Sequence, residues 1–167
     1  MSISRIEKIM SGGQMGADRA ALDWAIENGI SHGGWCPKGR RAEDGIIPER
    51  YQLGETPHPN YDQRTMWNVR DADATLIVTL SGELTGGTLL TAQCAKNIGR
   101  PCLHVMQTDD WRQKISDFLE KHSIRILNVA GPRGSEAPGI ERFVHVVLNA
   151  MKALSLCGKP LPTGRRN

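Results

Sequence analysis

The chain has 167 residues, a length typical of one domain, and 39% of them are hydrophobic. Its formal net charge of +3 and its aromatic content of 5% do not indicate a dedicated nucleic-acid surface. No apolar run approaches the roughly 18 residues of a membrane helix, and no signal-peptide pattern opens the sequence, so we expect a cytoplasmic protein without membrane partners.

Short apolar or β-branched segments alternate with segments of helical periodicity. The first kind predicts strands at Ile6–Met10, Gly34–Cys36, Thr75–Leu80, Cys102–Met106 and Ile126–Val129. The second kind predicts helices at Ala17–Asn28, Asp62–Val69, Thr88–Ile98, Trp111–Lys121 and Ile140–Leu156. This alternation is typical of the α/β class, with a mostly parallel sheet between two helical layers.

The domain organisation follows from the same pattern. We expect one domain over residues 1–157 and a flexible tail over 158–167, where prolines, glycines and arginines gather. The stretch from 37 to 60 interrupts the alternation and exceeds the usual loop length of about 12–15 residues. Because it contains apolar residues, we expect it to pack as a functional loop.

A glycine-rich turn follows the first predicted strand and contains Gly12, Gly13, Gln14 and Gly16. Such a turn lets a phosphate approach the backbone, and the helix that follows favours negative charge at its start. A Walker loop would need a lysine after Gly16, and a dinucleotide fingerprint would need a glycine at Ser11. A phosphate monoester therefore fits better than NAD, with a ligand-free strand-to-helix turn as the alternative.

A cationic run follows the second predicted strand. Lys38, Arg40 and Arg41 suit a phosphate or another oxyanion, because arginine can bind two oxygens at once. Glu43 and Asp44 follow directly, so a self-paired, solvated loop is the alternative.

A second glycine turn, Gly86-Gly87-Thr88, follows the third predicted strand, and Arg133 follows the last one. The amides and hydroxyl of this turn could hold a phosphate at the start of the next helix, or the turn could be an ordinary helix cap. Because the carboxyl ends of parallel strands share one edge of a sheet, we expect these groups to meet in one pocket.

Two further features bear on the pocket. Arg64 and Asn68 share one face of a predicted helix, where they line the pocket or lie on the helix surface. We find no nucleophile-elbow pattern and no C-x-x-C spacing, so we expect neither a catalytic residue nor a metal site.

Taken in order, these motifs resemble the putative molybdenum carrier family. Residues 11–25 resemble its opening signature, and residues 34–45 resemble its second one. The resemblance covers about residues 5–155 and continues through Arg64-Thr65 with Asn68, Gly86-Gly87-Thr88 and Asn128-Val129-Ala130-Gly131-Pro132-Arg133.

The resemblance implies a Rossmann-like three-layer sandwich, related to the lysine-decarboxylase-like and LONELY GUY-type proteins. It also implies a homodimer or homotetramer that binds molybdenum cofactor, a pterin with a dithiolene-held metal and a terminal phosphate, with molybdoenzymes as recipients. We expect the phosphorylated ligand to be held by Gly12, Gly13, Gln14, Gly16, Lys38, Arg40, Arg41, Gly86, Gly87, Thr88 and Arg133.

One departure from the related enzymes favours binding over catalysis. LONELY GUY-type phosphoribohydrolases carry Gly-Gly-x-Gly-Thr-x-x-Glu, whose glutamate is catalytic, whereas Thr91 occupies the corresponding position here. A hydroxyl cannot exchange a proton at neutral pH as a carboxylate does. A nucleotide-processing enzyme stays open because Glu83 lies just upstream, and a sensor of a nucleotide-like ligand is a further alternative.

Overall fold

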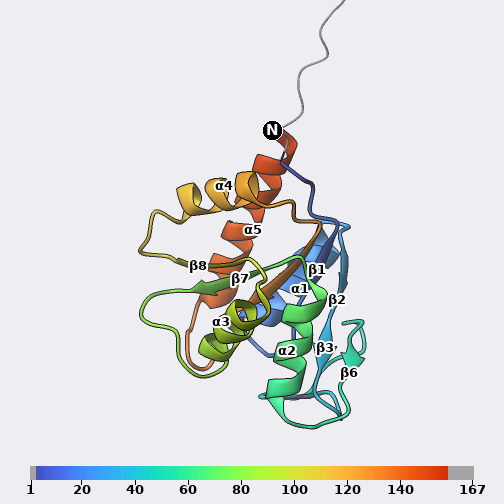
Figure 1. Cartoon of the computed structure of the whole chain (residues 1–167). Coiled ribbons are helices and arrows are strands. Elements are labelled where there is room, and N and C mark those ends of the chain that lie inside the picture. The colour runs from blue at the N-terminus through green and yellow to red at the C-terminus, as the bar shows by residue number, and fades with distance from the viewer. Residues whose placement is uncertain (1–2, 158–167) are drawn as a thin grey trace, which may run out of the picture.

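A five-stranded parallel sheet forms the centre of the protein (Figure 1). The structure is a computed structural model that describes residues 3–157, so the tail expected at 158–167 lies outside the described residues. In spatial order the strands are β2 (Ser31–Gly33), β1 (Lys8–Met10), β9 (Ile126–Ala130), β7 (Ala74–Thr79) and β8 (Cys102–Met106). The predicted α/β class and the Rossmann-like sandwich are confirmed.

One face of the sheet is apolar and carries the main core. It is covered by α1 (Ala17–Glu27), α4 (Trp111–Lys121) and α5 (Ile140–Cys157). Alternate strand residues point into this layer, so Leu76 and Val78 are fully buried against the helices. Each such side chain contributes about 1.5–3 kcal/mol through burial, which makes this layer the stable base of the fold.

The opposite face is polar and is covered by α2 (Tyr61–Asp71) and α3 (Gly86–Ile98), which lie beside each other (Figure 1). The intervening residues of the same strands point here, and Asn128 donates a hydrogen bond of 3.2 Å to Thr75. Thr79 and His104 are also hydrogen-bonded, at 2.8 Å. Burial lowers the pKa of His104, which favours its neutral form.

The prediction that Gly34–Cys36 forms a strand of the central sheet is wrong. The sheet strand is β2, and the chain leaves the sheet at Gly34, whose φ is +128°. A Cβ at this glycine would lie 2.2 Å from the carbonyl oxygen of Ser11, so the turn requires glycine. The next two residues form β3 (Trp35–Cys36), which pairs with β6 (Gly54–Glu55) outside the central sheet.

The stretch from 37 to 60 packs on a small core of its own, as its composition predicted. Ile47 and Tyr51 are buried there beside Leu22 and Cys36. Its regular structure is limited to β6 and a short antiparallel pair, β4 (Arg41–Ala42) and β5 (Gly45–Ile46).

Element boundaries agree closely with the predictions elsewhere. The bounds of β8 and α4 are as predicted, whereas α3 begins two residues early, at Gly86. This difference matters because it places both glycines of the second turn in the first turn of a helix. Within residues 3–157, no helix combines the length and apolarity needed to cross a membrane.

Candidate functional site

A pocket of about 580 Å³ opens where the starts of α2 and α3 meet the loop after β9. This volume lies within the roughly 300–1,000 Å³ typical of small-molecule sites. Three carboxyl-end loops converge here, those after β1, β7 and β9. These loops and the helices α2 and α3 line the pocket. The lining residues include Gln14, Asp18, Tyr61, Asp62, Arg64, Thr65, Thr85, Gly86, Gly87, Thr88, Thr91, Gly131, Arg133 and Glu136.

The first turn of α3 presents free backbone donors to this pocket. The amides of Gly86 and Gly87 donate no hydrogen bond to any residue of the described chain. A Cβ at either glycine would meet no atom within 4 Å, so the backbone is open to a ligand. The turn is held by Thr88, whose hydroxyl donates to the Thr85 carbonyl at 2.7 Å and accepts from the Thr85 amide.

Arg133 is the cation best placed to neutralise an anion at this helix start. It lines the pocket and forms no ion pair with any carboxylate of residues 3–157. Its guanidinium carbon lies 5.4 Å from the centre of the Tyr61 ring. Free amides and an uncompensated guanidinium together make this wall attractive to a phosphate.

Backbone contacts to the first glycine turn hold Arg133 in place. It pairs with Gly16 in an isolated antiparallel bridge, and the Gly134 amide donates to the Met15 carbonyl at 3.1 Å. Gly16 has a φ of +110°, and a Cβ there would lie 2.5 Å from the Gly134 nitrogen. The predicted glycine at position 16 thus serves this junction and is not part of the pocket wall.

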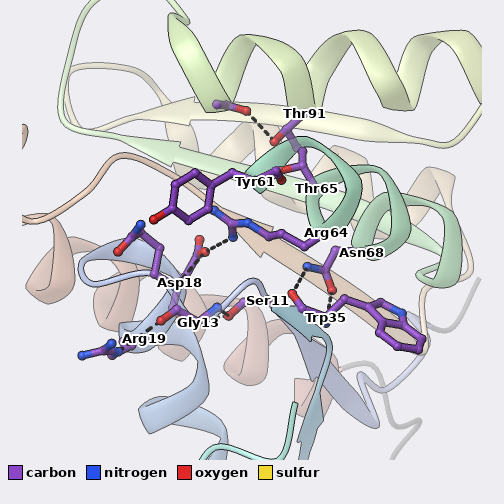
Figure 2. Close-up of polar contacts among 12 residues, drawn as sticks. Ser11, Gly13, Asp18, Arg19, Trp35, Tyr61, Arg64, Thr65, Asn68 and Thr91 are labelled. Atoms are coloured by element: carbon purple, nitrogen blue, oxygen red, sulfur yellow. Dashed lines mark hydrogen bonds and ion pairs between the residues drawn. The ribbon is translucent and has the colours of Figure 1, made fainter. Parts of the chain in front are cut away.

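Arg64 is partly neutralised within the protein. Its Nη1 donates to Asp18 Oδ2 at 2.9 Å, and both side chains are largely buried (Figure 2). Its guanidinium carbon lies 5.4 Å from the Tyr61 ring centre, so Arg64 and Arg133 both lie near this ring. The Nε of Arg64 is buried without an acceptor in the described residues.

Three amides of the first glycine turn, those of Gly13, Gln14 and Met15, are already used. The Gly13 amide donates to the Ser11 hydroxyl at 3.3 Å, and the Gln14 amide donates to Asp18 Oδ2 at 3.2 Å. The Met15 amide donates to Gln14 Oε1 at 3.0 Å. These internal bonds leave the turn little capacity to hold a phosphate, unlike the start of α3.

The first turn is also closed by side chains. A Cβ at Gly12 would lie 1.5 Å from Arg64 Nη1, and one at Gly13 would lie 2.6 Å from a methyl carbon of Leu53. The Gly13 carbonyl accepts from Arg19 Nε at 3.1 Å (Figure 2). Gly12 borders a separate cavity of about 20 Å³ that Arg64 also lines, and Gly13 borders neither this cavity nor the main pocket.

The predicted cationic run is not brought to the pocket. Lys38 and Arg41 are exposed, and neither they nor Arg40 belong to the pocket wall. Arg40 has a φ of +53°, and its guanidinium holds the loop together. It donates hydrogen bonds of 2.8–3.3 Å to the carbonyl oxygens of Ile47, Pro48, Tyr51 and Leu53.

This loop still reaches the site through its backbone. The Glu43 amide donates to Gln14 Oε1 at 2.8 Å. Its neighbour Asp44 pairs with Arg19, which holds the pKa of that carboxyl below its usual range. The loop thus orients Gln14, a residue of the pocket wall.

On α2 the structure divides the two polar residues that the sequence grouped. Arg64 lines the pocket, whereas Asn68 bonds both backbone groups of Trp35, at 2.8 and 2.9 Å (Figure 2). Tyr61 was not predicted, although it lies one helical turn before Arg64, a spacing that could have identified it.

The position that matches the glutamate of the related enzymes cannot supply an acid. Thr91 is buried, and its hydroxyl donates to the Gly87 carbonyl at 2.8 Å (Figure 2). The buried carboxylate that does line the pocket belongs to Asp18, whose place in the first turn of α1 also lets its charge favour the helix dipole. Its helix begins at Ala17, so that role and a place in the site are compatible.

Comparison with known proteins places this geometry in context. Residues 9–152 match the circularly permutated YpsA SLOG family. The crystal structure of a putative molybdenum carrier protein from Syntrophus aciditrophicus SB is 45% identical, with a TM-score of 0.83, over 87% of this chain and 94% of that chain. Among curated proteins, none matches the chain. The resemblance inferred from the sequence motifs is confirmed.

Proposed function

We propose that this chain, which belongs to the circularly permutated YpsA SLOG family, binds and carries a phosphorylated anionic small molecule. The observation that carries the proposal is the open start of α3, where two glycine amides without acceptors stand in one pocket wall with Arg133. A phosphate there gains charge-assisted hydrogen bonds, each contributing about 1.5–3 kcal/mol.

The charges around the pocket favour an anion at Arg133. Arg133 has no carboxylate partner in the described chain, whereas the charge of Arg64 is offset by Asp18. Asp62 and Glu136 add two exposed residues with carboxylates to the same wall, and neither pairs with Arg133. A ligand that places its phosphate at Arg133 suits this distribution.

Molybdenum cofactor is the ligand that we propose. The name of the 45%-identical neighbour, a putative molybdenum carrier protein, supports this choice. The terminal phosphate would bind at Gly86, Gly87 and Arg133, and the pterin would lie near Tyr61. Within residues 3–157, no three His, Cys, Asp or Glu side chains are grouped to hold a metal ion. The proposal therefore leaves the metal on the dithiolene sulfurs of the cofactor.

We also propose that the carrier works in the cytoplasm as a homodimer or homotetramer and delivers its cargo to molybdoenzymes. Native mass spectrometry of the freshly purified protein, with elemental analysis for molybdenum, tests the assembly and the cargo together. A strictly monomeric protein would contradict the first proposal, and cargo without molybdenum would contradict the second.

Titration with molybdenum cofactor released from a molybdoenzyme, under anaerobic conditions, tests the proposed function. Replacing Arg133 by alanine should weaken binding at least about tenfold, because a charge-assisted contact is lost. Arg112→Ala is the matched control, because Arg112 also stacks on an aromatic ring, 4.1 Å from the centre of Trp111, but lies on α4. Equal affinities of the two variants would contradict the proposal.

Hydrolysis of a nucleoside monophosphate is the second candidate, and the Asp18 carboxylate in the pocket wall favours it. A carboxylate can assist departure of the base or activate water, as threonine cannot. Incubation with a panel of nucleoside monophosphates, followed by chromatography for free base, tests this activity. Turnover that disappears in Asp18→Asn would establish it, and no turnover across the panel would remove it.

A further inference from the structure

Gln14 carries a hydrogen-bond donor that the protein itself does not use. The residue is 6% exposed and forms part of the pocket wall. Its Nε2 is buried and has no acceptor in residues 3–157. An unpaired buried donor is costly, so an acceptor is expected from outside the chain.

The orientation of this amide group is fixed by its other end. Oε1 accepts from the Met15 amide at 3.0 Å and from the Glu43 amide at 2.8 Å. A flipped amide would set its NH2 group against two N–H donors, so the assignment of oxygen and nitrogen is unambiguous. Nε2 can therefore only donate, and it faces away from the loop that holds Oε1.

The pocket is the place where an acceptor can reach this nitrogen. The nearest charged acceptor in the same turn, Asp18 Oδ2, already receives the Gln14 backbone amide and Arg64 Nη1. The phosphate end of the ligand is assigned to α3 and Arg133, where the charge lies. Gln14 and Tyr61 line the same pocket, and a neutral amide donor beside an aromatic wall residue suits a neutral acceptor on a ring.

We propose that Gln14 Nε2 recognises an exocyclic oxygen acceptor on the ring of the bound ligand. The pocket then selects an oxo-substituted heterocycle, as in hypoxanthine or a pterin, over an amino-substituted one such as adenine. This inference rests on the proposed function, because it assumes a phosphorylated ligand in this pocket. It adds the feature by which the protein distinguishes one ring from another.

Entry of the ring requires a small rearrangement, because Nε2 is itself covered. The Tyr61 side chain is a wall group with few polar contacts to hold it. Its hydroxyl makes no hydrogen bond within the described chain, and only the two arginines stack on its ring.

Two purine monophosphates that differ at one exocyclic group test the inference. Inosine monophosphate presents an oxo group where adenosine monophosphate presents an amino group, and both carry the same phosphate. In calorimetric titrations of the full chain, the oxo compound should bind about tenfold more tightly or better, because the amino compound leaves Nε2 facing a donor.

Gln14→Glu is the informative variant. It keeps one oxygen for the Met15 and Glu43 amides and replaces the donor by an acceptor, so the preference should vanish or reverse. Gln14→Leu, with its fold checked by thermal melting, should abolish the preference without reversing it. An unchanged ratio in both variants overturns the inference, as does equal binding of the two purines by the wild type. Equal weakening of both by Gln14→Glu also overturns it, because Gln14 would then act on the phosphate.

If neither purine binds, the same variants are titrated with molybdenum cofactor, whose pterin carries an oxo group. A wild-type affinity retained in Gln14→Glu overturns the inference while the proposed function stands. An Arg133→Ala variant that binds the cofactor as well as the wild type signals failure of the proposed function instead.

Discussion

The two glycine turns of this protein have similar sequences and opposite structures. Gly12 and Gly13 lie in a turn where the amides of Gly13, Gln14 and Met15 bond within the chain and where Arg64 and Leu53 fill the space beside the two glycines. Gly86 and Gly87 start a helix, donate to no described residue and have open space where a Cβ would stand. The first turn joins α1 to the loop after β9, and the second presents donors to the pocket.

The difference teaches that glycines at a helix start can serve either of two purposes, and that the sequence does not distinguish them. Glycine allows a ligand to approach the backbone, and it equally allows another part of the chain to approach it. The first turn meets Pro132 and Gly134, residues more than a hundred positions away. Only the second turn has the open space that the phosphate-binding interpretation requires.

The largest expected effect is on the closed turn. Gly16→Ala should lower the free energy of unfolding by about 4 kcal/mol or more, because its Cβ would overlap the backbone of residues 132–134. Gly29→Ala is the control, since Gly29 also has a positive φ but open space around it, and it should cost about 1–2 kcal/mol. Urea unfolding measures both. Equal losses of unfolding free energy in the two variants would contradict the close packing that we assign to the first turn.

The next effect concerns the loop that packs against the closed turn. Arg40→Ala should lower the free energy of unfolding by about 2–3 kcal/mol, because four carbonyl oxygens lose a charged donor. Arg41→Ala should change it by less than about 0.5 kcal/mol, since Arg41 is exposed. Denaturant titration of the two variants checks this. Weaker ligand binding in Arg41→Ala with unchanged stability would show that the cationic run takes part in the binding site after all.

A change at the open turn should affect binding and spare the fold. Gly87→Ala should leave stability within about 1 kcal/mol, because alanine suits a helix and its Cβ meets no atom. Affinity for molybdenum cofactor should fall about tenfold, since the methyl group crowds the approach to the amides. Calorimetry and thermal melting measure the two quantities. A destabilised variant with normal affinity would reverse the roles of the two turns.

The smallest effect is expected at the contact between the loop and α1. Asp44→Asn should cost less than about 1 kcal/mol at neutral pH, because the carboxylate paired with Arg19 is 38% exposed and screened. The pKa of Asp44 is lowered from 3.8, so its contribution is present above pH 3.8 and is lost as the pH falls below that value. Unfolding curves of variant and wild type at several pH values should converge in acid. A stability difference between variant and wild type that persists at low pH would show that it does not come from the ion pair.

The sequence predicts most of the fold because periodicity is local. The bounds of β8 and α4 follow from their own residues, and the hydrophobic pattern places the sheet between helices. The prediction fails at Gly34, where the backbone passes close to Ser11, just after β1, and turns away from the sheet. The residue pattern around Gly34 does not indicate this close approach.

The candidate site is less predictable for the same reason. Within Lys38, Arg40 and Arg41, nothing in the sequence indicates that the middle cation turns inward to bind carbonyl oxygens. Arg133 and the second glycine turn were identified because strand ends converge at one edge of a parallel sheet. Tyr61 could have been identified from its spacing to Arg64 on α2, but its place beside Arg133 depends on how α2 lies beside the loop after β9.

Amide NMR of the 15N-labelled protein, titrated with inorganic phosphate, tests the central claim most directly. We predict that the signals of Gly86 and Gly87 shift and saturate, because their free amides receive the phosphate, whereas those of Gly12 and Gly13 stay in place. Saturating shifts at Gly12 and Gly13, with Gly86 and Gly87 unmoved, would contradict it.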